Sequence, residues 1–319
     1  MLEGKPGDSI VEMPSLSPGD RIRLRKLLSV LIFFLITGIG VFYYNRHKED
    51  FQLITTVSVS ALVILFFLRL TLILCYGVQV KILTDHYNLD LGFPQWFGLS
   101  RLTNFTNLLL PLGGGTSVKA VYLKKFHNLR YSSFIASNAI GSMIKILVIS
   151  LFSSILLFFL GGRSGMLLLT ITGAVFTGTL TFLFLAHRIQ RYLPRSLGYL
   201  KTIIEEWMLI RKDHKTIMKL ILLNCFIFII FSLEIYTAYR VFSIKVSPVP
   251  SGVIASFTMF SGVLHLVPAG LGVTEAVFLA ISTVCSLGIN AGLHAALLRR
   301  IIGTVLTLVF VPFFAHKLL

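Results

Sequence analysis

Six apolar stretches in this chain are long enough, or nearly so, to cross a lipid bilayer as helices. Crossing a hydrocarbon core of about 30 Å takes about 20 apolar residues in a helix. The stretches occupy residues 27–44, 53–80, 134–160, 166–186, 221–241 and 291–314. Hydrophobic residues make up 55% of the chain and charged residues only 13%, which excludes a soluble domain. We therefore predict an all-α, polytopic membrane helix bundle.

The basic residues gather between the apolar stretches. The formal net charge is +16, a value that could suggest a nucleic-acid partner. Basic loops are, however, what the positive-inside rule produces in membrane proteins, so we expect no nucleic-acid partner. We predict that residues 1–26 form a basic cytoplasmic tail and residues 27–319 a single transmembrane domain. The polar stretch 187–219 contains eight basic residues, and its amphipathic part, 197–210, is expected to lie on the membrane surface.

Two further apolar stretches are interrupted by proline and glycine. Proline breaks a helix, and glycine lets the chain turn without a steric cost. Inside hydrocarbon such a break leaves backbone groups unpaired unless it lines a cavity. The helix that restarts after the break would present its N-terminal N–H groups to that cavity, which suits an anion. The interrupting residues are Pro111, Gly113, Gly114 and Gly115 in the first stretch, and Pro268, Gly270 and Gly272 in the second.

The two interruptions resemble each other. With a one-residue gap, Pro111 matches Pro268, Gly115 matches Gly272, and residues 119–123 (KAVYL) match residues 275–279 (EAVFL). Short matches also arise by chance, but paired interrupted segments are the best sequence pointer to a transporter's midplane site. We predict an internal repeat: repeat 1 over about 53–160, a cytoplasmic linker at 187–219, and repeat 2 over about 220–316.

The distribution of charge also predicts the orientation. If the first interrupted stretch dips into the membrane and returns to the same side, every heavily basic loop lies in the cytoplasm. Six full spans then remain and both termini are cytoplasmic. The second interrupted stretch enters from the opposite face, so the two re-entrant hairpins form an inverted repeat in the plasma (inner) membrane.

Two ionisable residues follow the breaks. A charge at bilayer depth costs about 2.5–3.5 kcal/mol, so each needs a partner or a wet cavity. Lys119 can meet an anionic group, or its side chain can reach the cytoplasmic interface. Glu275 can bind an amino group or a proton, or simply lie at a helix start, where the helix dipole favours a carboxylate.

Other charges lie within the apolar stretches and are candidate supporting residues. Glu234 and the arginines at 299 and 300 all fall toward the outer ends of their spans, so an ion pair between them is expected. That pair can be structural or functional. His265 can be a proton-linked group or a hydrogen-bonded structural residue. The supporting candidates are Arg69, Lys145, Glu234, His265 and Arg300, beside Arg299 as a candidate transport residue.

No pattern of catalytic residues is present. The sequence has no GxSxG, HExxH or P-loop motif, and its acidic residues are too scattered for a paired-carboxylate site. Cys75, Cys225 and Cys285 lie in apolar segments without a CxxC pair. We therefore expect no enzymatic activity, no cofactor and no metal site.

Two blocks of sequence resemble one known family. NLLLPLGGGTSVKAVYLKK followed by LRYSSFIAS, and VPAGLGVTEAVFL followed by ALLRRIIGTVL, resemble the signatures of the lysylphosphatidylglycerol synthase transmembrane-region family. The resemblance implies an integral inner-membrane protein, and the two-domain members move an aminoacylated anionic phospholipid across the bilayer. Their aminoacyl-transferring domain would follow residue 319, so we expect no synthase activity. By this resemblance the first signature consists of Pro111, Gly113, Gly114 and Gly115, and Lys119 occupies the position where an arginine is expected. The second signature consists of Pro268, Gly270, Gly272 and Glu275, and Arg299 is its later arginine.

The leading hypothesis is a flippase-like lipid translocase. An anionic headgroup, from a phospholipid or a polyprenyl-linked glycolipid, would lie between the two broken helices, with the helix N-termini, Lys119 and Arg299 neutralising it. The alternative is an accessory membrane subunit that assists a lipid-modifying glycosyl- or aminoacyl-transferase. A third hypothesis, a transporter of small solutes or ions, requires a more polar pore lining than the sequence displays.

Overall fold

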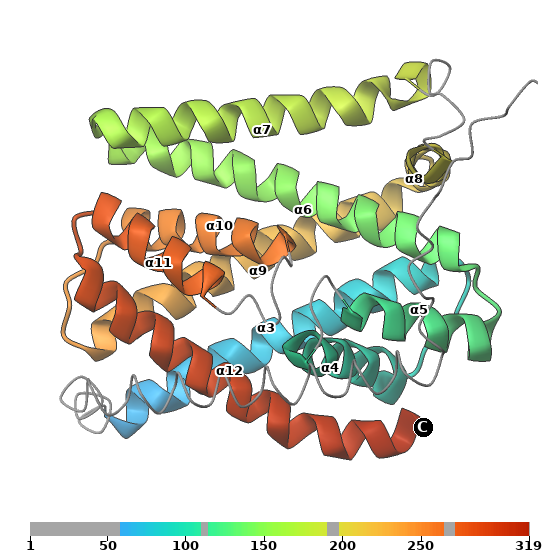
Figure 1. Cartoon of the computed structure of the whole chain (residues 1–319), viewed down its shortest axis with the longest axis horizontal. Coiled ribbons are helices and arrows are strands. Elements are labelled where there is room, and N and C mark those ends of the chain that lie inside the picture. The colour runs from blue at the N-terminus through green and yellow to red at the C-terminus, as the bar shows by residue number, and fades with distance from the viewer. Residues whose placement is uncertain (1–57, 110–113, 190–197, 265–271, 319) are drawn as a thin grey trace, which may run out of the picture. The chain divides into compact units, whose positions relative to one another are not determined.

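The computed structural model describes residues 58–109, 114–189, 198–264 and 272–318, all within the compact unit of residues 49–319. These ranges form ten helices and no strand (Figure 1), so the all-α prediction is confirmed for them. The predicted tail at 1–26 and the predicted span at 27–44 lie outside the described residues. The helices are α3 (Val59–Asp85), α4 (Phe93–Leu109), α5 (Gly114–His127), α6 (Tyr131–Leu160), α7 (Gly162–Ile189), α8 (Gly198–Ile210), α9 (His214–Val241), α10 (Pro248–Leu264), α11 (Val273–Val284) and α12 (Ile289–Leu318).

Five of the described helices are long and apolar enough to span a membrane: α3, α6, α7, α9 and α12. They correspond to five of the six predicted spans, and the sixth is the one outside the described residues. At a rise of about 1.5 Å per residue, helices of 27 to 30 residues exceed a bilayer core of about 30 Å. The chain is thus a multi-pass helical membrane protein.

Both predicted interruptions separate pairs of shorter helices. The first pair is α4, which ends at Leu109, and α5, which begins at Gly114; the second is α10, which ends at Leu264, and α11, which begins at Val273. The two helices of each pair pack against each other. The first pair begins at Phe93. The predicted residues Pro111, Gly113, His265, Pro268 and Gly270 fall in the two gaps and lie outside the described residues.

Two sets of four helices have matching lengths. Helices α3 to α6 have 27, 17, 14 and 30 residues, and α9 to α12 have 28, 17, 12 and 30. Their packing is reciprocal: α3 packs along α9, while α4 packs on α12 and α10 packs on α6 (Figure 1). The first helix of each broken pair, α4 or α10, therefore contacts the last long helix of the other set.

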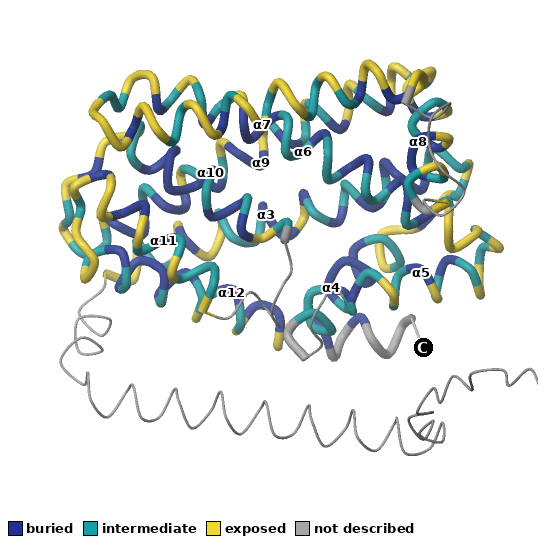
Figure 2. Tube along the Cα trace, turned by 45° about the horizontal axis from the view of Figure 1, so that its top comes forward, coloured by how far each residue is buried: buried dark blue, intermediate teal, exposed yellow. Residues whose placement is uncertain are grey.

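Helices α7 and α8 lie outside these two sets. Exposed and half-buried residues dominate α7 (Figure 2), which packs mainly on α6. Helix α8 confirms the predicted amphipathic segment. Its buried residues Ile203, Ile204 and Ile210 belong to a face that packs on α6, so protein rather than lipid covers part of its apolar surface.

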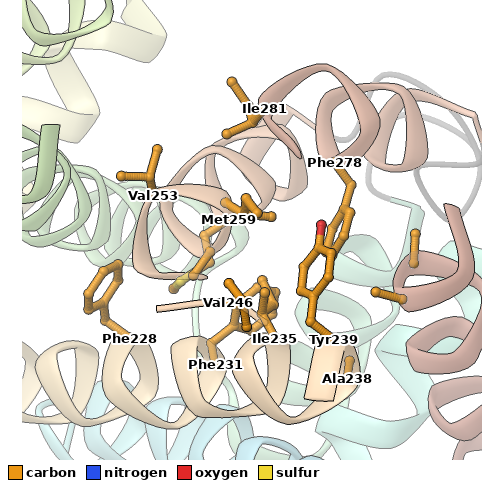
Figure 3. Close-up of a cluster of buried hydrophobic side chains, with 14 of the residues drawn as sticks. Phe228, Phe231, Ile235, Ala238, Tyr239, Val246, Val253, Met259, Phe278 and Ile281 are labelled. Atoms are coloured by element: carbon orange, nitrogen blue, oxygen red, sulfur yellow. The ribbon is translucent and has the colours of Figure 1, made fainter. Parts of the chain in front are cut away.

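An apolar cluster fixes the second broken pair against α9. In Figure 3, side chains of α9, among them Phe231 and Tyr239, point toward α10 and α11. They pack in one cluster with Met259 of α10 and Phe278 of α11. The rings of Tyr239 and Phe278 stack at 5.9 Å between centroids, and the Tyr239 hydroxyl hydrogen bonds with Ser282 of α11. Aromatic pairs of this kind add about 0.5–1.5 kcal/mol beyond area burial. Two of these rings, Phe231 and Phe278, also form part of the wall of the cavity described next.

Candidate functional site

A cavity of about 440 Å³ lies between the two broken pairs and their flanking spans. All eight helices of the two matched sets contribute to its wall, whereas α7 and α8 contribute none of the described lining residues. The volume is within the range of small-molecule and headgroup sites. The neutral polar side chains of the lining include Gln79, Asn104, Asn107, Thr116, Asn138 and Ser142. The sequence expectation that a polar lining is lacking is therefore wrong, because the polar residues come from many helices and are scattered along the chain.

Positive charge dominates the lining. Six of the charged residues singled out in the sequence meet there, and only one of them is acidic. They are Arg69, Lys119, Lys145, Glu275, Arg299 and Arg300. Gly114, Gly115 and Gly272 lie at helix starts and are not among the lining residues, so their roles concern the backbone.

Glu234 lies behind the wall and joins two of these arginines. Its Oε2 accepts a hydrogen bond from Nη2 of Arg299 at 3.0 Å, and its Oε1 is 3.3 Å from Nη1 of Arg69. Glu234 is 1% exposed. The predicted pairing of Glu234 with an arginine is thus present, but with Arg69 as a second partner. One carboxylate between two guanidinium groups leaves this trio with one net positive charge.

Arg299 is held between aromatic rings. Its guanidinium carbon lies 4.5 Å from the ring centre of Phe231 and 5.5 Å from that of Phe278, distances at which a cation is attracted to the ring face. Its Nε has no hydrogen-bond partner among the described residues. The aromatic cluster of α9 and α11 therefore positions this cation at the cavity wall.

Glu275 has two structural partners. Its Oε2 accepts a hydrogen bond from the backbone N–H of Gly272 at 2.9 Å, which caps the start of α11. Its Oε1 pairs with Nη1 of Arg300. The interpretation of Glu275 as a carboxylate at a helix start is thus what the structure shows, together with a contact across to α12. The amide of Gly272 is occupied by this contact, so it is not available to an anion in this conformation.

Lys145, Lys119 and Arg101 provide positive charge on the opposite side, from α6, α5 and α4. The Nζ of Lys145 lies 5.2 Å from the ring centre of Tyr76. Arg101 is 1% exposed, donates a hydrogen bond to Ser100 Oγ at 3.3 Å, and lies over the ring of Phe97. Within the described part of the chain, none of these three cations has a carboxylate oxygen within 4 Å.

Sequence reasoning missed Arg101 entirely. The signal that could have found it is the position of a lone arginine inside the first interrupted stretch, in a region that has no aspartate or glutamate between Asp90 and Glu205.

Gly115 explains why the first broken pair packs so closely. A Cβ atom at this position would overlap the backbone carbonyl of Thr103 and lie 2.7 Å from Oδ1 of Asn107. The N–H of Gly115 donates to that same Asn107 oxygen at 2.8 Å. The glycine therefore permits contact between α4 and α5 and does not act only as a turn residue. One amide at the start of α5 is also occupied, so side-chain cations are the main source of positive charge in the cavity.

A polar network lies beyond the end of α3. His86 Nδ1 is 3.0 Å from Asp213 Oδ2, and Asp213 caps α9 through Thr216. The hydrogen bonds from Thr216 and His86 hold the pKa of Asp213 well below its usual value. The hydroxyl of Tyr87 donates to Glu206 Oε2 at 2.9 Å. The network thus ties α3 to α8 and α9.

The fold and the cavity define a multi-pass helical membrane protein with a cationic cavity bordered by two broken helix pairs. The chain belongs to the family described as the lysylphosphatidylglycerol synthase TM region, which its sequence matches over residues 76–310. A comparison with curated protein sequences gives no match.

Proposed function

We propose that this protein is a flippase-like translocase of an anionic lipid, without enzymatic activity of its own. The observation that carries the proposal is the excess of positive charge in the cavity, where five lining cations face one lining carboxylate. Uncompensated charge at bilayer depth is costly unless a ligand or water neutralises it. Membership of the lysylphosphatidylglycerol synthase TM region family, which is named after a phospholipid synthase, supports a lipid as that ligand.

The proposed topology has six spans, two re-entrant pairs and both termini in the cytoplasm of the plasma membrane. Matching lengths in the two sets of helices and their reciprocal packing support an inverted repeat. Broken helices at equivalent positions of two repeats commonly border a transporter's midplane site. In this arrangement the headgroup occupies the cavity while the acyl chains stay in the bilayer.

The charged residues would have distinct tasks during translocation. The buried bonds of Glu234 keep Arg69 and Arg299 in place, so this trio forms a fixed part of the wall. The contact between Glu275 and Arg300 joins α11 to α12 at half-buried positions, and we propose that it opens when the headgroup passes. Glu275 would then be free to accept a proton or an amino group.

The test is lipid transfer by the purified protein in liposomes, with fluorescent anionic and zwitterionic lipids. Wild type should transfer the anionic lipid selectively. Glu275→Gln should reduce that transfer at least about tenfold while the protein still inserts and folds, because the charge of the mobile contact is lost. Lys125→Gln, which removes an exposed charge outside the cavity lining, is the matched control.

Other outcomes would favour the competing functions. Transfer that is unchanged in Glu275→Gln contradicts the role given to this residue. A folded wild-type protein that transfers no lipid would favour the accessory-subunit function, and the search would turn to a partner lipid-modifying enzyme. The polar lining also suits a small anion, so saturable uptake of such an ion without lipid transfer would support the third function.

A further inference from the structure

The two sides of the cavity differ in their charge balance. On the side of α9, α11 and α12, the carboxylates Glu234 and Glu275 pair with Arg69, Arg299 and Arg300, so three cations meet two carboxylates. On the side of α4, α5 and α6, the cations Arg101, Lys119 and Lys145 meet none among the described residues. The unmet positive charge is therefore concentrated on the second side.

The described carboxylates cannot supply this charge, because other contacts already occupy most of them. Asp85 and Asp90 lie within 4 Å of Lys81, and Asp213 contacts His86. Glu206 accepts a hydrogen bond from Tyr87, and Glu205 is an exposed residue of α8. The two gap segments in the chain after α4 and α10, residues 110–113 and 265–271, contain no acidic residue in sequence. No described carboxylate is therefore left to neutralise this side, and an anion from outside the chain would do so.

We infer that the α4–α5–α6 side of the cavity binds a phosphoryl group with at least two negative charges, as in a phosphomonoester or a diphosphate. The inference rests on the proposed function, because it places the headgroup in the same cavity and specifies its chemistry. Six cations and two carboxylates in and behind the wall leave a formal excess of four positive charges. A phosphodiester with one negative charge would leave three of these positive charges without a counter-charge. A headgroup with a net positive charge would increase the excess.

The neutral side chains of this side fit the same ligand. Asn104, Thr116, Asn138 and Ser142 line the cavity from the same three helices as the cations. They offer amide and hydroxyl donors to a group with three or more acceptor oxygens. Lys119 and Lys145 line the cavity, while the fully buried Arg101 stands behind Ser100. The lysines would contact the phosphoryl oxygens and Arg101 would strengthen the positive field from behind.

Competition binding with the purified full-length protein in detergent tests the inference. The probe is a fluorescent short-chain phosphatidic acid at pH 8, where a phosphomonoester has lost its second proton, whose pKa is about 6. The competitors are unlabelled phosphatidic acid, farnesyl diphosphate, phosphatidylglycerol and inorganic pyrophosphate. Phosphatidic acid and farnesyl diphosphate should bind at least about tenfold more tightly than phosphatidylglycerol.

Substitutions on the two lysines locate the preference. Lys119→Gln and Lys145→Gln should each weaken phosphatidic acid at least about tenfold and affect phosphatidylglycerol less. Lys125→Gln, an exposed lysine of the same helix as Lys119, should bind as wild type does. Lys119→Arg should retain the preference, which separates loss of charge from loss of fold.

Each further outcome has a defined meaning. Equal binding of phosphatidylglycerol and phosphatidic acid by the wild-type protein overturns the inference, even if the protein transfers lipid in liposomes. This comparison requires no variant. If pyrophosphate binds as tightly as farnesyl diphosphate, the inference about the phosphoryl group is supported. Lipid transfer in liposomes then decides the source: transfer supports a lipid, and its absence supports a free phosphate and refutes the proposed translocation.

Discussion

Neutralising Glu234 should destabilise the protein more than the loss of any exposed charge. The carboxylate is 1% exposed and holds Arg299 at 3.0 Å and Arg69 at 3.3 Å. In Glu234→Gln both guanidinium groups stay at the cavity wall without a counter-charge. Breaking a buried ion pair costs about 3–5 kcal/mol. We expect a value near the lower end, about 3 kcal/mol, because the Arg69 side chain is 27% exposed and water can partly solvate it.

The free energy of unfolding, measured by denaturant titration in mixed micelles, checks this value. Asp90→Asn is the control, because this carboxylate is 99% exposed and lies 3.6 Å from Lys81. Removal of such a surface charge should change stability by less than about 1 kcal/mol. A Glu234→Gln protein as stable as the control would mean that Glu234, Arg69 and Arg299 do not form a structural unit. These charges would then be no more fixed than the contact between Glu275 and Arg300.

Two further predictions concern local structure. Gly115→Ala should destabilise the protein by about 1–3 kcal/mol, because the added Cβ overlaps the Thr103 carbonyl. Gly178→Ala is the control and should not lower the melting temperature, because a Cβ there meets nothing within 4 Å. Equal effects of the two substitutions would contradict the close packing of α4 and α5. Because hydrogen bonding with Thr216 lowers the pKa of Asp213 in the folded state, its contribution is complete above its usual pKa of about 4 and is lost as pH falls below that value. Asp213→Asn should therefore flatten the dependence of the melting temperature on pH between about 5 and 2, and a profile that stays parallel to wild type would contradict this.

The helices were predictable because their signals are local. A run of apolar residues such as that of α6 defines a span by length alone, and the helix breaks at Leu109 and Leu264 follow from nearby glycine and proline. Boundaries were less accurate. Helix α7 begins at Gly162, before its apolar run, since the positive φ of Gly161 and Gly162 lets the chain reverse within two residues.

The charge pairing was only partly predictable. The sequence placed Glu234 near the arginines of α12, because residue counts give the depth of a residue in its span. It could not give Arg69 as a second partner, since that contact depends on how α3 packs along α9. Arg101 was missed for a similar reason: its burial arises from the packing of α4 and not from its own neighbours in the chain. The role of Gly115 likewise depends on a carbonyl one helix away.

The reciprocal packing has a consequence for the order in which the protein can be assembled during synthesis. Helix α4 packs on α12, and every helix from α5 to α11 is translated between them. The first broken pair is therefore synthesised well before its neighbour exists, and the cationic side chains of its helices then still lack one wall of their cavity. Final closure of this region has to wait until α12 leaves the ribosome, so during biogenesis water, lipid headgroups or a membrane chaperone must cover the first broken pair.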